Sequence, residues 1–494
     1  MLADLATWLG SRTGVDASVD VCGDASVVVT GVTLSSRRVV PGDLYAALPG
    51  ARSHGVGFAA EALAAGAVAV LTDPVGAQRL PAGTPAVVVP TPRALLGPLA
   101  AHVYGDPAAD LRMMAVTGTQ GKTTTTRLAE GGLQRAGIPA AVIGTVGTRI
   151  LGVDVKSDLT TPEAPDLHGL FALMREQGVA ACAMEVSSHA LVMGRVDGVV
   201  FDVATFLNLG RDHLDFHADI DDYFAAKASL FTPERARLGL VNVDDEWGRR
   251  LVEQATIQVR TFSITGAEAD WHAVDVESTA TGSTFSVRGP DGIAVAGGVG
   301  LPGSFNVANA LAAVASCAEA GFEASRVAAG VATGGGVPGR LERIDAGQDF
   351  VVVVDYAHKP DAVEAAIGTL RPLTSGRVIV VLGAGGDRDP GKRPMMGEIA
   401  ARLADVLIVT DDNPRTEDPA AIRAALTAGA SGPGEVVEIG DRREAIRAAV
   451  DRARPGDIVL IAGKGHETGQ EIDGVVHPFN DREVAAAAIR EVTR

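Results

Sequence analysis

The sequence predicts an α/β protein of three domains with a doubly wound parallel sheet at its centre. Short apolar runs, typical of buried strands, alternate with helical segments along the chain. A chain of 494 residues is long enough for roughly three domains, and a hydrophobic content of 47% provides each with an ordinary core. A strand, a glycine loop and a helix follow one another over residues 111–137. We expect the domains to span residues 1–107, 108–336 and 337–494.

The loop T-G-T-Q-G-K-T-T at residues 117–124 has the composition of a phosphate cradle. It follows an apolar strand expected at 113–116 and precedes a helix expected at 125–135. Gly118 and Gly121 allow backbone N–H groups to approach phosphate oxygens, and the helix N-terminus adds positive potential. The unit therefore predicts a nucleotide-binding site.

Lys122 and Thr123 supply the chemistry of this loop. The lysine can reach the β- and γ-phosphates of ATP, and the threonine can ligate a magnesium ion. The strict P-loop pattern has glycine six residues before the lysine, where this chain has Val116, so the loop is a variant. A chance Gly-Lys-Thr turn is the alternative, and the flanking strand and helix favour nucleotide binding over it. We expect ATP to contact Gly118, Thr119, Gln120, Gly121, Lys122, Thr123 and Thr124.

Composition excludes several classes of protein. A net charge of −18 and an aromatic content of 4% disfavour a nucleic-acid partner, which needs basic surfaces and stacking platforms. Cys22, Cys182 and Cys317 show no C-x-x-C spacing, so neither a disulfide framework nor a zinc site is indicated. No apolar run approaches transmembrane length, and the N-terminus lacks a signal-peptide pattern. We expect a cytoplasmic protein without membrane insertion, and a monomer, although the sequence does not fix the oligomeric state.

The residues before the phosphate loop indicate a small α/β domain. Pro41-Gly42-Asp43 marks a turn that leads into a short strand, and apolar strands are expected at 67–71 and 86–89. This interpretation holds whatever the domain binds.

Polar residues of the central domain follow its apolar strands, where the functional loops of a parallel sheet lie. Glu185 ends an apolar strand expected at 179–186, and an unpaired carboxylate there would be costly. A magnesium ion would explain it, and a salt bridge at the sheet edge is the alternative. Thr161 and Pro162 suggest a helix start, with the threonine as N-cap and the proline at the first helical position.

The third domain repeats this pattern. Strands are expected at 350–354, 378–382, 406–410 and 458–462, and the last three lead into polar, glycine-bearing or Asn-Pro loops, as a binding crevice demands. The glycine run at 334–336 that precedes this domain predicts a hinge.

Four further patterns allow a family comparison. These are S-S-R with P-G-D-L-Y-A-A-L-P-G within residues 35–50, N-x-x-x-D-H-L-D-x-H at 208–217, D-Y-x-x-A-K-x-x-L-F at 222–231 and D-Y-A-H-x-P-D at 355–361. Together with the loop variant they resemble the Mur ligases, which are ATP-dependent amide ligases, and the related folylpolyglutamate synthetases. The first pattern is similar to the UDP-sugar-binding domain of Mur ligases, which folylpolyglutamate synthetases lack.

The resemblance implies the roles of the three domains. A P-loop ATPase sheet would lie between an N-terminal UDP-binding α/β domain and a C-terminal Rossmann-like α/β domain. It also implies catalytic roles for Lys122, Glu185, His213 and Lys227, with Thr123, Glu185, His213 and a carbamate formed by CO2 on Lys227 as magnesium ligands. A structural histidine and a solvated surface lysine are the ordinary alternatives for His213 and Lys227.

Two further substrate sites follow from the resemblance. The UDP-sugar peptide would contact Leu34, Ser36, Ala51, Arg52, Ser53, Thr160, Thr161, Ser187, Met193 and Arg195; the family often has glutamine at the position of Met193. The adenine and ribose of ATP would contact Asn306, Asn309, Arg340 and Asp355.

The tetrad Asp412-Asn413-Pro414-Arg415 resembles that of ligases that use meso-2,6-diaminopimelate, whereas lysine-adding relatives usually lack its arginine. The implied reaction joins this amino acid to UDP-N-acetylmuramoyl-L-alanyl-D-glutamate with ATP. A lysine-adding ligase, a folylpolyglutamate synthetase-like ligase and a non-catalytic nucleotide-binding regulator are the alternatives. The amino acid would contact Arg388, Asp412, Asn413, Pro414, Arg415, Gly463 and Glu467.

Overall fold

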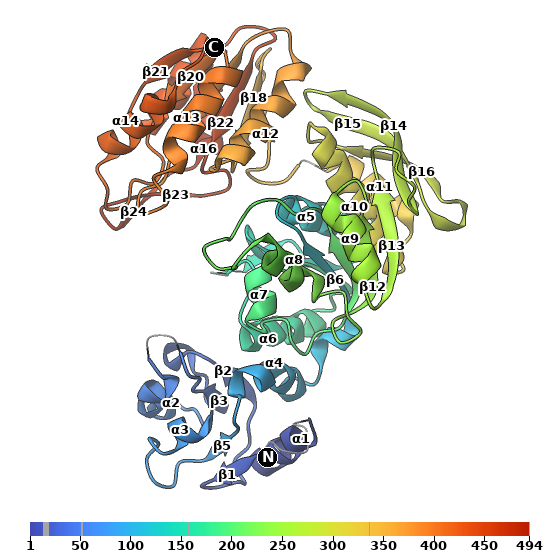
Figure 1. Ribbon diagram of the computed structural model, residues 1–494, viewed down its shortest axis with the longest axis vertical. Coiled ribbons are helices and arrows are strands. Elements are labelled where there is room, and N and C mark those ends of the chain that lie inside the picture. The colour runs from blue at the N-terminus through green and yellow to red at the C-terminus, as the bar shows by residue number, and fades with distance from the viewer. Residues whose placement is uncertain (13–18, 51–52, 156–158, 335, 494) are drawn as a thin grey trace. The chain divides into compact units, whose positions relative to one another are not determined.

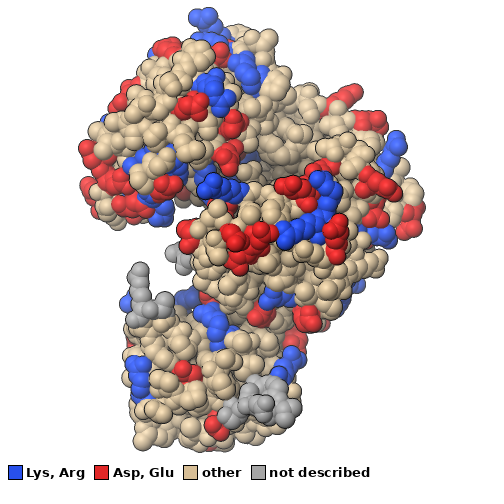
Figure 2. All heavy atoms as spheres, in the orientation of Figure 1, with Lys and Arg blue, Asp and Glu red and all other residues tan. Residues whose placement is uncertain are grey.

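The computed structural model describes residues 1–12, 19–50, 53–155, 159–334 and 336–493 (Figure 1). Helices and strands alternate over the chain, so the predicted α/β fold class is confirmed. Among the described residues, no helix is both long and apolar enough to cross a membrane. On the face drawn in Figure 2, acidic and basic side chains are interspersed and no broad basic surface is visible.

The chain forms two compact units. One consists of Met1–Trp271 and Ala312–Val327, and the other of His272–Leu311 and Ala328–Arg494. The three domain boundaries expected from the sequence stay a prediction. Gly335 lies outside the described residues, so the hinge in the glycine run also stays a prediction.

The first unit begins with a small sheet of order β1-β5-β4-β3-β2, in which only β1 is antiparallel to its neighbour. The apolar residues of these strands pack against the helices, with Leu44 and Leu71 fully buried. Its elements are α1 (Leu2–Arg12), β1 (Asp20–Cys22), β2 (Gly31–Thr33), β3 (Asp43–Ala46), α2 (Ala59–Ala64), β4 (Ala69–Thr72), α3 (Pro74–Ala77), β5 (Ala86–Val88) and α4 (Pro92–Val103).

The central sheet follows in the same unit, with the order β13-β12-β11-β6-β10-β7-β8-β9. Its strands are parallel from β13 to β7, and the buried apolar runs of β6, β7, β10 and β11 suit a sheet covered on both faces. Its elements are β6 (Arg112–Thr117), α5 (Lys122–Arg135), β7 (Ala140–Gly144), β8 (Gly147–Ile150), β9 (Val153–Val155), α6 (Ala164–Glu176), β10 (Ala181–Glu185), α7 (Ser188–Val192), β11 (Phe201–Phe206), α8 (Ile220–Ala228), β12 (Ala236–Asn242), α9 (Glu246–Gln254) and β13 (Gln258–Ser263).

Two helix starts differ from the prediction. Helix α5 begins at Lys122, three residues before the expected start at 125, because Gly121 adopts φ +88° and closes the loop there. Helix α6 begins at Ala164 with Glu163 as its N-cap, so the assignment of Thr161 as N-cap was wrong. The Thr161 hydroxyl donates instead to the carbonyl oxygen of Glu185, at 2.8 Å.

The second unit contains an antiparallel meander and a second doubly wound sheet of order β17-β18-β22-β19-β20-β21. All strands of this sheet except β17 are parallel, and apolar clusters cover both of its faces. Its elements are β14 (Trp271–Thr279), β15 (Gly282–Arg288), β16 (Ala294–Val299), β17 (Glu342–Ile344), β18 (Val351–Asp355), α12 (Pro360–Leu370), β19 (Val378–Leu382), α13 (Lys392–Leu403), β20 (Val406–Val409), α14 (Pro419–Gly429), β21 (Glu435–Glu438), α15 (Arg442–Arg452), β22 (Ile458–Ala462), β23 (Gly469–Ile472), β24 (Val475–Pro478) and α16 (Asp481–Val492).

Two helices, α10 (Ser304–Glu319) and α11 (Ala324–Ala332), have residues in both units. Short 3-10 helices complete the described elements: η1 (Ser36–Arg38), η2 (Gly55–Phe58), η3 (Pro107–Asp110), η4 (Pro290–Gly292) and η5 (Arg371–Leu373).

Candidate active site

The phosphate loop lies between the central strand β6 and helix α5, as the sequence predicts. Gly118 has φ +149°, and a Cβ there would lie 3.1 Å from Leu207 Cβ and 3.3 Å from the Asn208 oxygen. Asn208 holds the loop from the end of β11: its carbonyl oxygen accepts from the N–H of Thr119 at 3.0 Å, and its Oδ1 accepts from the N–H of Gln120 at 2.9 Å. The backbone and the side chain of Asn208 therefore both hold N–H groups of the loop.

Two lysines converge on one carbonyl oxygen of this loop. Lys122 Nζ donates to the Gly118 oxygen at 2.6 Å, and Lys227 Nζ donates to the same oxygen at 2.9 Å. Lys227 is 1% exposed, and its Nζ lies 4.6 Å from the ring centroid of Tyr223. Burial and the nearby Lys122 charge hold the pKa of Lys227 well below its usual value, opposed in part by Asp212. A solvated surface lysine is thus excluded for Lys227.

Glu185 is the last residue of β10 and is 1% exposed. Its Oε1 accepts from the Thr145 N–H at 2.8 Å and its Oε2 from the Thr145 hydroxyl at 3.0 Å. Both donors are neutral, and no cation forms an ion pair with Glu185 within the described part of the chain. The salt bridge considered as the alternative for this carboxylate is therefore not what holds it.

His213 and the neighbouring His217 play different parts. His213 has φ +54° and a side chain that is 38% exposed, and its ring centroid lies 4.8 Å from that of His189. His217 is buried between Ser188 Oγ at 2.9 Å and Asp222 Oδ2 at 3.0 Å, so it has a structural role. His213 is thus the more accessible of the two imidazoles for a ligand.

The described residues contain no cluster of three His, Cys, Asp or Glu side chains that could hold a metal ion. The magnesium set expected from the resemblance has only Glu185 and His213 of these types, so it needs the Thr123 hydroxyl and a modified Lys227. Within that set the buried Glu185 carboxylate, held by neutral donors alone, suits a divalent cation. An unmodified lysine does not, because an ammonium repels a cation.

Residues expected to meet the UDP-sugar peptide gather around the end of β10. Thr161 Oγ1 donates to the Glu185 carbonyl oxygen and accepts from the Ser187 N–H at 3.3 Å. The hydroxyls of Thr160 and Thr145 lie 3.1 Å apart. The structure therefore brings Thr160, Thr161 and Ser187 together.

Arg195 lies beside this group. Its Nε donates to Glu163 Oε1 at 2.8 Å, and its Nη2 lies 3.4 Å from the sulfur of Met193. Arg93 Nη1 from α4 donates to the other oxygen of Glu163 at 2.7 Å. Glu163 thus joins Arg195 to the N-terminal part of the unit.

The other residues expected to contact the UDP-sugar lie in the N-terminal part of the first unit. Leu34 packs against the apolar core of the first sheet, and Ser36 Oγ donates to Glu61 Oε2 at 3.0 Å. Ser53 is exposed. Ala51 and Arg52 lie outside the described residues, so their assignment to the UDP-sugar stays a prediction.

The residues expected near the adenine and ribose belong to the second unit. Asn309 Nδ2 donates to Asn306 Oδ1 at 3.2 Å, so the two amides share one face of α10. Asp355 accepts from the N–H groups of Leu341 at 2.7 Å and Ala357 at 2.8 Å. Burial raises the pKa of Asp355, and the Arg340 charge opposes this rise. Their roles toward ATP stay predictions.

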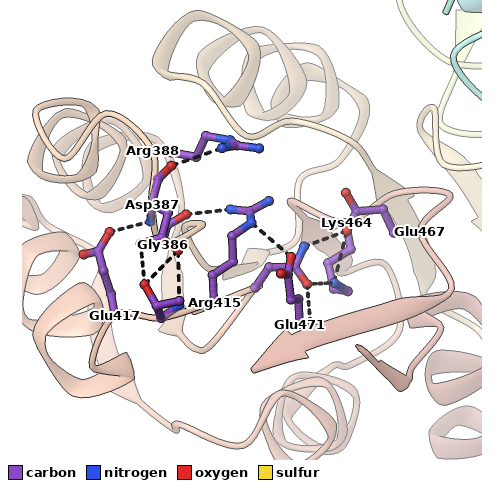
Figure 3. A network of polar contacts seen from close by, with 10 residues as sticks. Gly386, Asp387, Arg388, Arg415, Glu417, Lys464, Glu467 and Glu471 are labelled. Carbon is purple, nitrogen blue, oxygen red and sulfur yellow. Dashed lines mark hydrogen bonds and ion pairs between the residues drawn. The ribbon is translucent and has the colours of Figure 1, made fainter. Parts of the chain in front are cut away.

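The two arginines expected to bind the amino acid lie close together after β19 and β20 (Figure 3). Arg415 Nη1 donates to the Gly386 oxygen at 2.6 Å, and its Nε donates to Glu471 Oε2 at 3.2 Å. Arg388 is exposed, and its Nη1 donates to the Asp387 oxygen at 3.1 Å. Figure 3 shows the two guanidinium groups extending in the same direction. They could therefore receive one anionic group, or two that lie close together.

Asn413 is held in one orientation by a buried lysine. Lys464, which has no exposed surface, donates to Asn413 Oδ1 at 2.8 Å and to Glu467 Oε2 at 3.1 Å. The Asn413 amide donates in turn to Glu467 Oε2 at 2.8 Å. Gly463 has φ +118°, and a Cβ there would lie 2.3 Å from Asp412 Oδ2. The loops after β20 and β22 thus form one polar surface.

Sequence reasoning missed several residues that shape these sites. Lys464 lies in the loop that follows the strand expected at 458–462, but nothing in the local pattern shows that its side chain is buried. The hairpin β23–β24 had a usable signal, because Asp473-Gly474 between apolar residues is typical of a tight hairpin turn. The quoted patterns contain Asn208, Asp212 and Tyr223 without a role of their own, and nothing in the sequence assigned a site role to Thr145, Glu163 or Glu471.

Three family models match the chain. The model described as Mur ligase middle domain covers residues 116–317, that of Mur ligase, glutamate ligase domain, covers 339–465, and that of Mur ligase family, catalytic domain, covers 28–104. Together they cover most of the chain.

Named relatives extend this match over nearly the full length. A Streptomyces coelicolor protein named UDP-N-acetylmuramoyl-L-alanyl-D-glutamate--2,6-diaminopimelate ligase is 56% identical over 95% of this chain and 94% of its own. A Corynebacterium glutamicum protein of the same name is 50% identical over 98% and 95%. A solved structure of an enzyme with that name is 36% identical, with a TM-score of 0.70 over 94% of this chain and 96% of that chain. The chain belongs to the Mur ligase family.

Proposed function

We propose that this protein is an ATP-dependent ligase that adds meso-2,6-diaminopimelate to UDP-N-acetylmuramoyl-L-alanyl-D-glutamate in peptidoglycan precursor synthesis. Support comes from the relatives named for this reaction and from the chain's own amino-acid site. The observation that carries the choice of amino acid is the placement of Arg415 and Arg388 against the same glycine, Gly385 (Figure 3). We propose that the reaction takes place in the cytoplasm and that the enzyme is a monomer.

The reaction needs two steps because a carboxylate is a poor electrophile. The γ-phosphoryl group of ATP passes to the D-glutamate side-chain carboxylate, which gives an acyl phosphate and ADP. The amino group of the incoming amino acid then attacks the acyl carbon, and the tetrahedral intermediate collapses with loss of inorganic phosphate and a proton. The products are the tripeptide, ADP and phosphate.

The phosphate loop would hold ATP for the first step. The backbone N–H groups that Gly118 and Gly121 expose, and the N-terminus of α5, suit the phosphate oxygens. Lys122 Nζ already lies over the loop and would move from the Gly118 and Thr119 oxygens to the γ-phosphate. The positive charge of Lys122 would stabilise the transition state, because negative charge develops there on the phosphoryl group that is transferred.

Thr123, Glu185, His213 and a carbamoylated Lys227 would hold magnesium. The ion would neutralise charge on the phosphate groups of ATP. The environment of Lys227 supports its modification: carbamoylation needs a neutral amine, and burial beside Lys122 lowers the pKa of this lysine. The carbamate would turn a cation into an anion at a place where a cation is costly.

The second step requires the amino acid to be oriented. Meso-diaminopimelate has a distal carboxylate where lysine has no anionic group. A guanidinium can hold a carboxylate through two parallel hydrogen bonds, so Arg415 would favour diaminopimelate and disfavour lysine. Arg388 would hold the same carboxylate or the proximal one. Glu467 and Asn413 would receive an ammonium group.

The test is an ADP-release assay in which each substrate is omitted in turn. We expect turnover only with ATP, magnesium, the UDP-linked dipeptide and meso-diaminopimelate together, and a much lower kcat/KM with L-lysine. Preference for lysine would overturn the choice of amino acid. ADP release with a folate in place of the UDP-linked dipeptide would favour the folylpolyglutamate synthetase alternative, and nucleotide binding without turnover would favour the regulator.

A further inference from the structure

The hairpin β23–β24 is a well-defined element beside the amino-acid site. Asp473 and Gly474 form its two-residue turn with φ +50° and +75°, the combination that matches the twist of a tight hairpin. The register pairs Glu471 with Val476 and fixes the side of the hairpin to which Glu471 points.

This hairpin contacts the tetrad at residues 412–415. Gln470 Nε2 donates to the Asp412 oxygen at 2.7 Å, and the Glu471 N–H donates to Asn413 Oδ1 at 3.0 Å. The Arg415 N–H donates to the Glu471 oxygen at 3.0 Å. Three of the four tetrad residues are thus held by one short stretch of β23.

Arg415 is held in both its backbone and its side chain. Its φ of +53° lies in the left-handed region, which is unfavourable for a residue with a Cβ, and a bridge to Ile472 stabilises it there. Glu471 Oε2 accepts from Nε, and the Gly386 oxygen accepts from Nη1. Among the described residues nothing accepts from Nη2, so Nη2 and the second N–H of Nη1 are left for a ligand.

We propose that Glu471 is a positioning residue that sets the specificity of the amino-acid site. By holding Nε it fixes the plane of the Arg415 guanidinium and presents the Nη1–Nη2 edge to the distal carboxylate of the amino acid. This inference rests on the proposed function and deepens it. Without Glu471 the arginine side chain would have to lose its rotamer freedom when the substrate binds, which lowers affinity.

The charge of Glu471 does not explain such a role. A carboxylate beside Arg415 repels the substrate carboxylate, so through charge alone it would weaken binding. Its benefit is therefore geometric and comes from the acceptor oxygen. Glutamine keeps an acceptor oxygen at this position and loses the charge, whereas alanine loses both, so the two variants separate geometry from charge.

The experiment compares Glu471→Ala, Glu471→Gln and a control, Glu435→Ala, in steady-state kinetics. Glu435 pairs with Arg452 at 2.8 Å at the start of β21, at the opposite end of the strands from the site. We expect Glu471→Ala to raise KM for meso-diaminopimelate about tenfold, with kcat and KM for ATP within about twofold of native. Glu471→Gln should stay within about threefold of native, and Glu435→Ala should match native.

An unchanged KM for meso-diaminopimelate in Glu471→Ala would overturn the inference. So would a parallel rise in KM for all three substrates, which would indicate general structural damage, or an equal defect in Glu471→Gln, which would indicate a role for charge. Failure of the proposed function gives a different result, because the native protein would then show no ADP release that depends on meso-diaminopimelate.

Discussion

The phosphate loop and the amino-acid site both lie at the carboxyl ends of parallel strands, yet they hold their charges differently. At the phosphate loop, Lys122 and Lys227 donate to a carbonyl oxygen and Glu185 accepts from neutral donors. At the amino-acid site, charged groups are already paired: Lys464 with Glu467 at 3.1 Å and Arg415 with Glu471 at 3.2 Å.

The charge of each proposed ligand would account for this difference. ATP and magnesium bring large charges of both signs, and they would replace the neutral contacts of the buried Lys227 and Glu185. Meso-diaminopimelate has two ammonium and two carboxylate groups and no net charge at neutral pH. The charges of such a site are balanced, and its donors and acceptors are fixed in place. It therefore selects a ligand by the arrangement of the ligand's charged groups rather than by the ligand's net charge. The two sites therefore call for different tests.

Lys227→Ala is expected to have the largest effect. If the lysine supplies a carbamate to the metal site, the variant should lose activity by about a thousandfold or more, because both the ligand and the charge are lost. Short-chain carboxylates such as acetate should restore part of the activity by occupying the space of the carbamate. The measurement is the rate of ADP release with and without added carboxylate.

Acetate must leave the native rate unchanged for this test to hold, and Lys227→Met serves as a control that fills the space without a charge. Unimpaired turnover by Lys227→Ala would remove the carbamate from the mechanism. Carbon-13 NMR of the native protein with labelled CO2 gives an independent readout of the modification.

Arg415→Ala tests the amino-acid site at its most specific contact. Loss of one partner of a charged, hydrogen-bonded pair costs about 2–5 kcal/mol, so kcat/KM for meso-diaminopimelate should fall by about thirtyfold or more. The value for L-lysine should change little, because Arg415 has no acceptor on that substrate. Preference between the two amino acids, measured as the ratio of kcat/KM, should therefore collapse. If the ratio stays at its native value, Arg415 does not set the specificity.

The two units bury different charged or titratable groups, so we expect acid to affect their stability differently. Arg442 and Asp481, both without exposed side-chain surface, form an ion pair at 2.7 Å in the second unit. The first unit instead buries His168, whose Nε2 lies 3.2 Å from the Asp197 oxygen and whose Nδ1 has no partner among the described residues. Burial lowers the pKa of His168 to about 4.

The sign of the pH effect follows from this pKa. Between about pH 4 and 6.5 the unfolded chain binds a proton that the folded chain does not, so stability rises with pH across this window. The free energy of unfolding should be about 2 kcal/mol lower at pH 5 than at pH 7.5. His168→Gln should reduce the pH dependence of the unfolding of the first unit, measured by calorimetry. An undiminished dependence in the variant would assign the acid sensitivity to another group.

The sequence was sufficient for the buried parallel strands and the loops that follow them. Buried strands are continuous apolar runs, so β19 and β22 were predicted at the residues where they occur. Their polar loops then meet at one edge because the strands are parallel. Helix starts were harder: Thr161-Pro162 has a good capping pattern, but the Thr161 hydroxyl is used by the Glu185 carbonyl oxygen, a tertiary contact without a local signal.

The candidate site shows the same limit. The type of residue at a motif predicted that Glu185, Asn413 and Arg415 would lie at strand ends. It did not reveal their partners, since Thr145, Lys464 and Glu471 come from other parts of the chain. These partners decide whether a charge is balanced before the ligand arrives, and that property belongs to the folded chain alone.

Met193 gives the smallest expected effect and tests the third substrate. Its sulfur lies 3.4 Å from Arg195 Nη2, and a thioether is a weak acceptor. Met193→Gln would offer Arg195 an amide oxygen and the UDP-linked dipeptide an N–H donor. One added hydrogen bond contributes about 0.5–1.5 kcal/mol, and Arg195 is already paired with Glu163, so we expect KM for the dipeptide to fall by about threefold. Met193→Leu, of similar volume without an acceptor, should stay at the native value. A higher KM in Met193→Gln would show that Met193 packs against an apolar part of the substrate and that the glutamine of the relatives is not its equivalent.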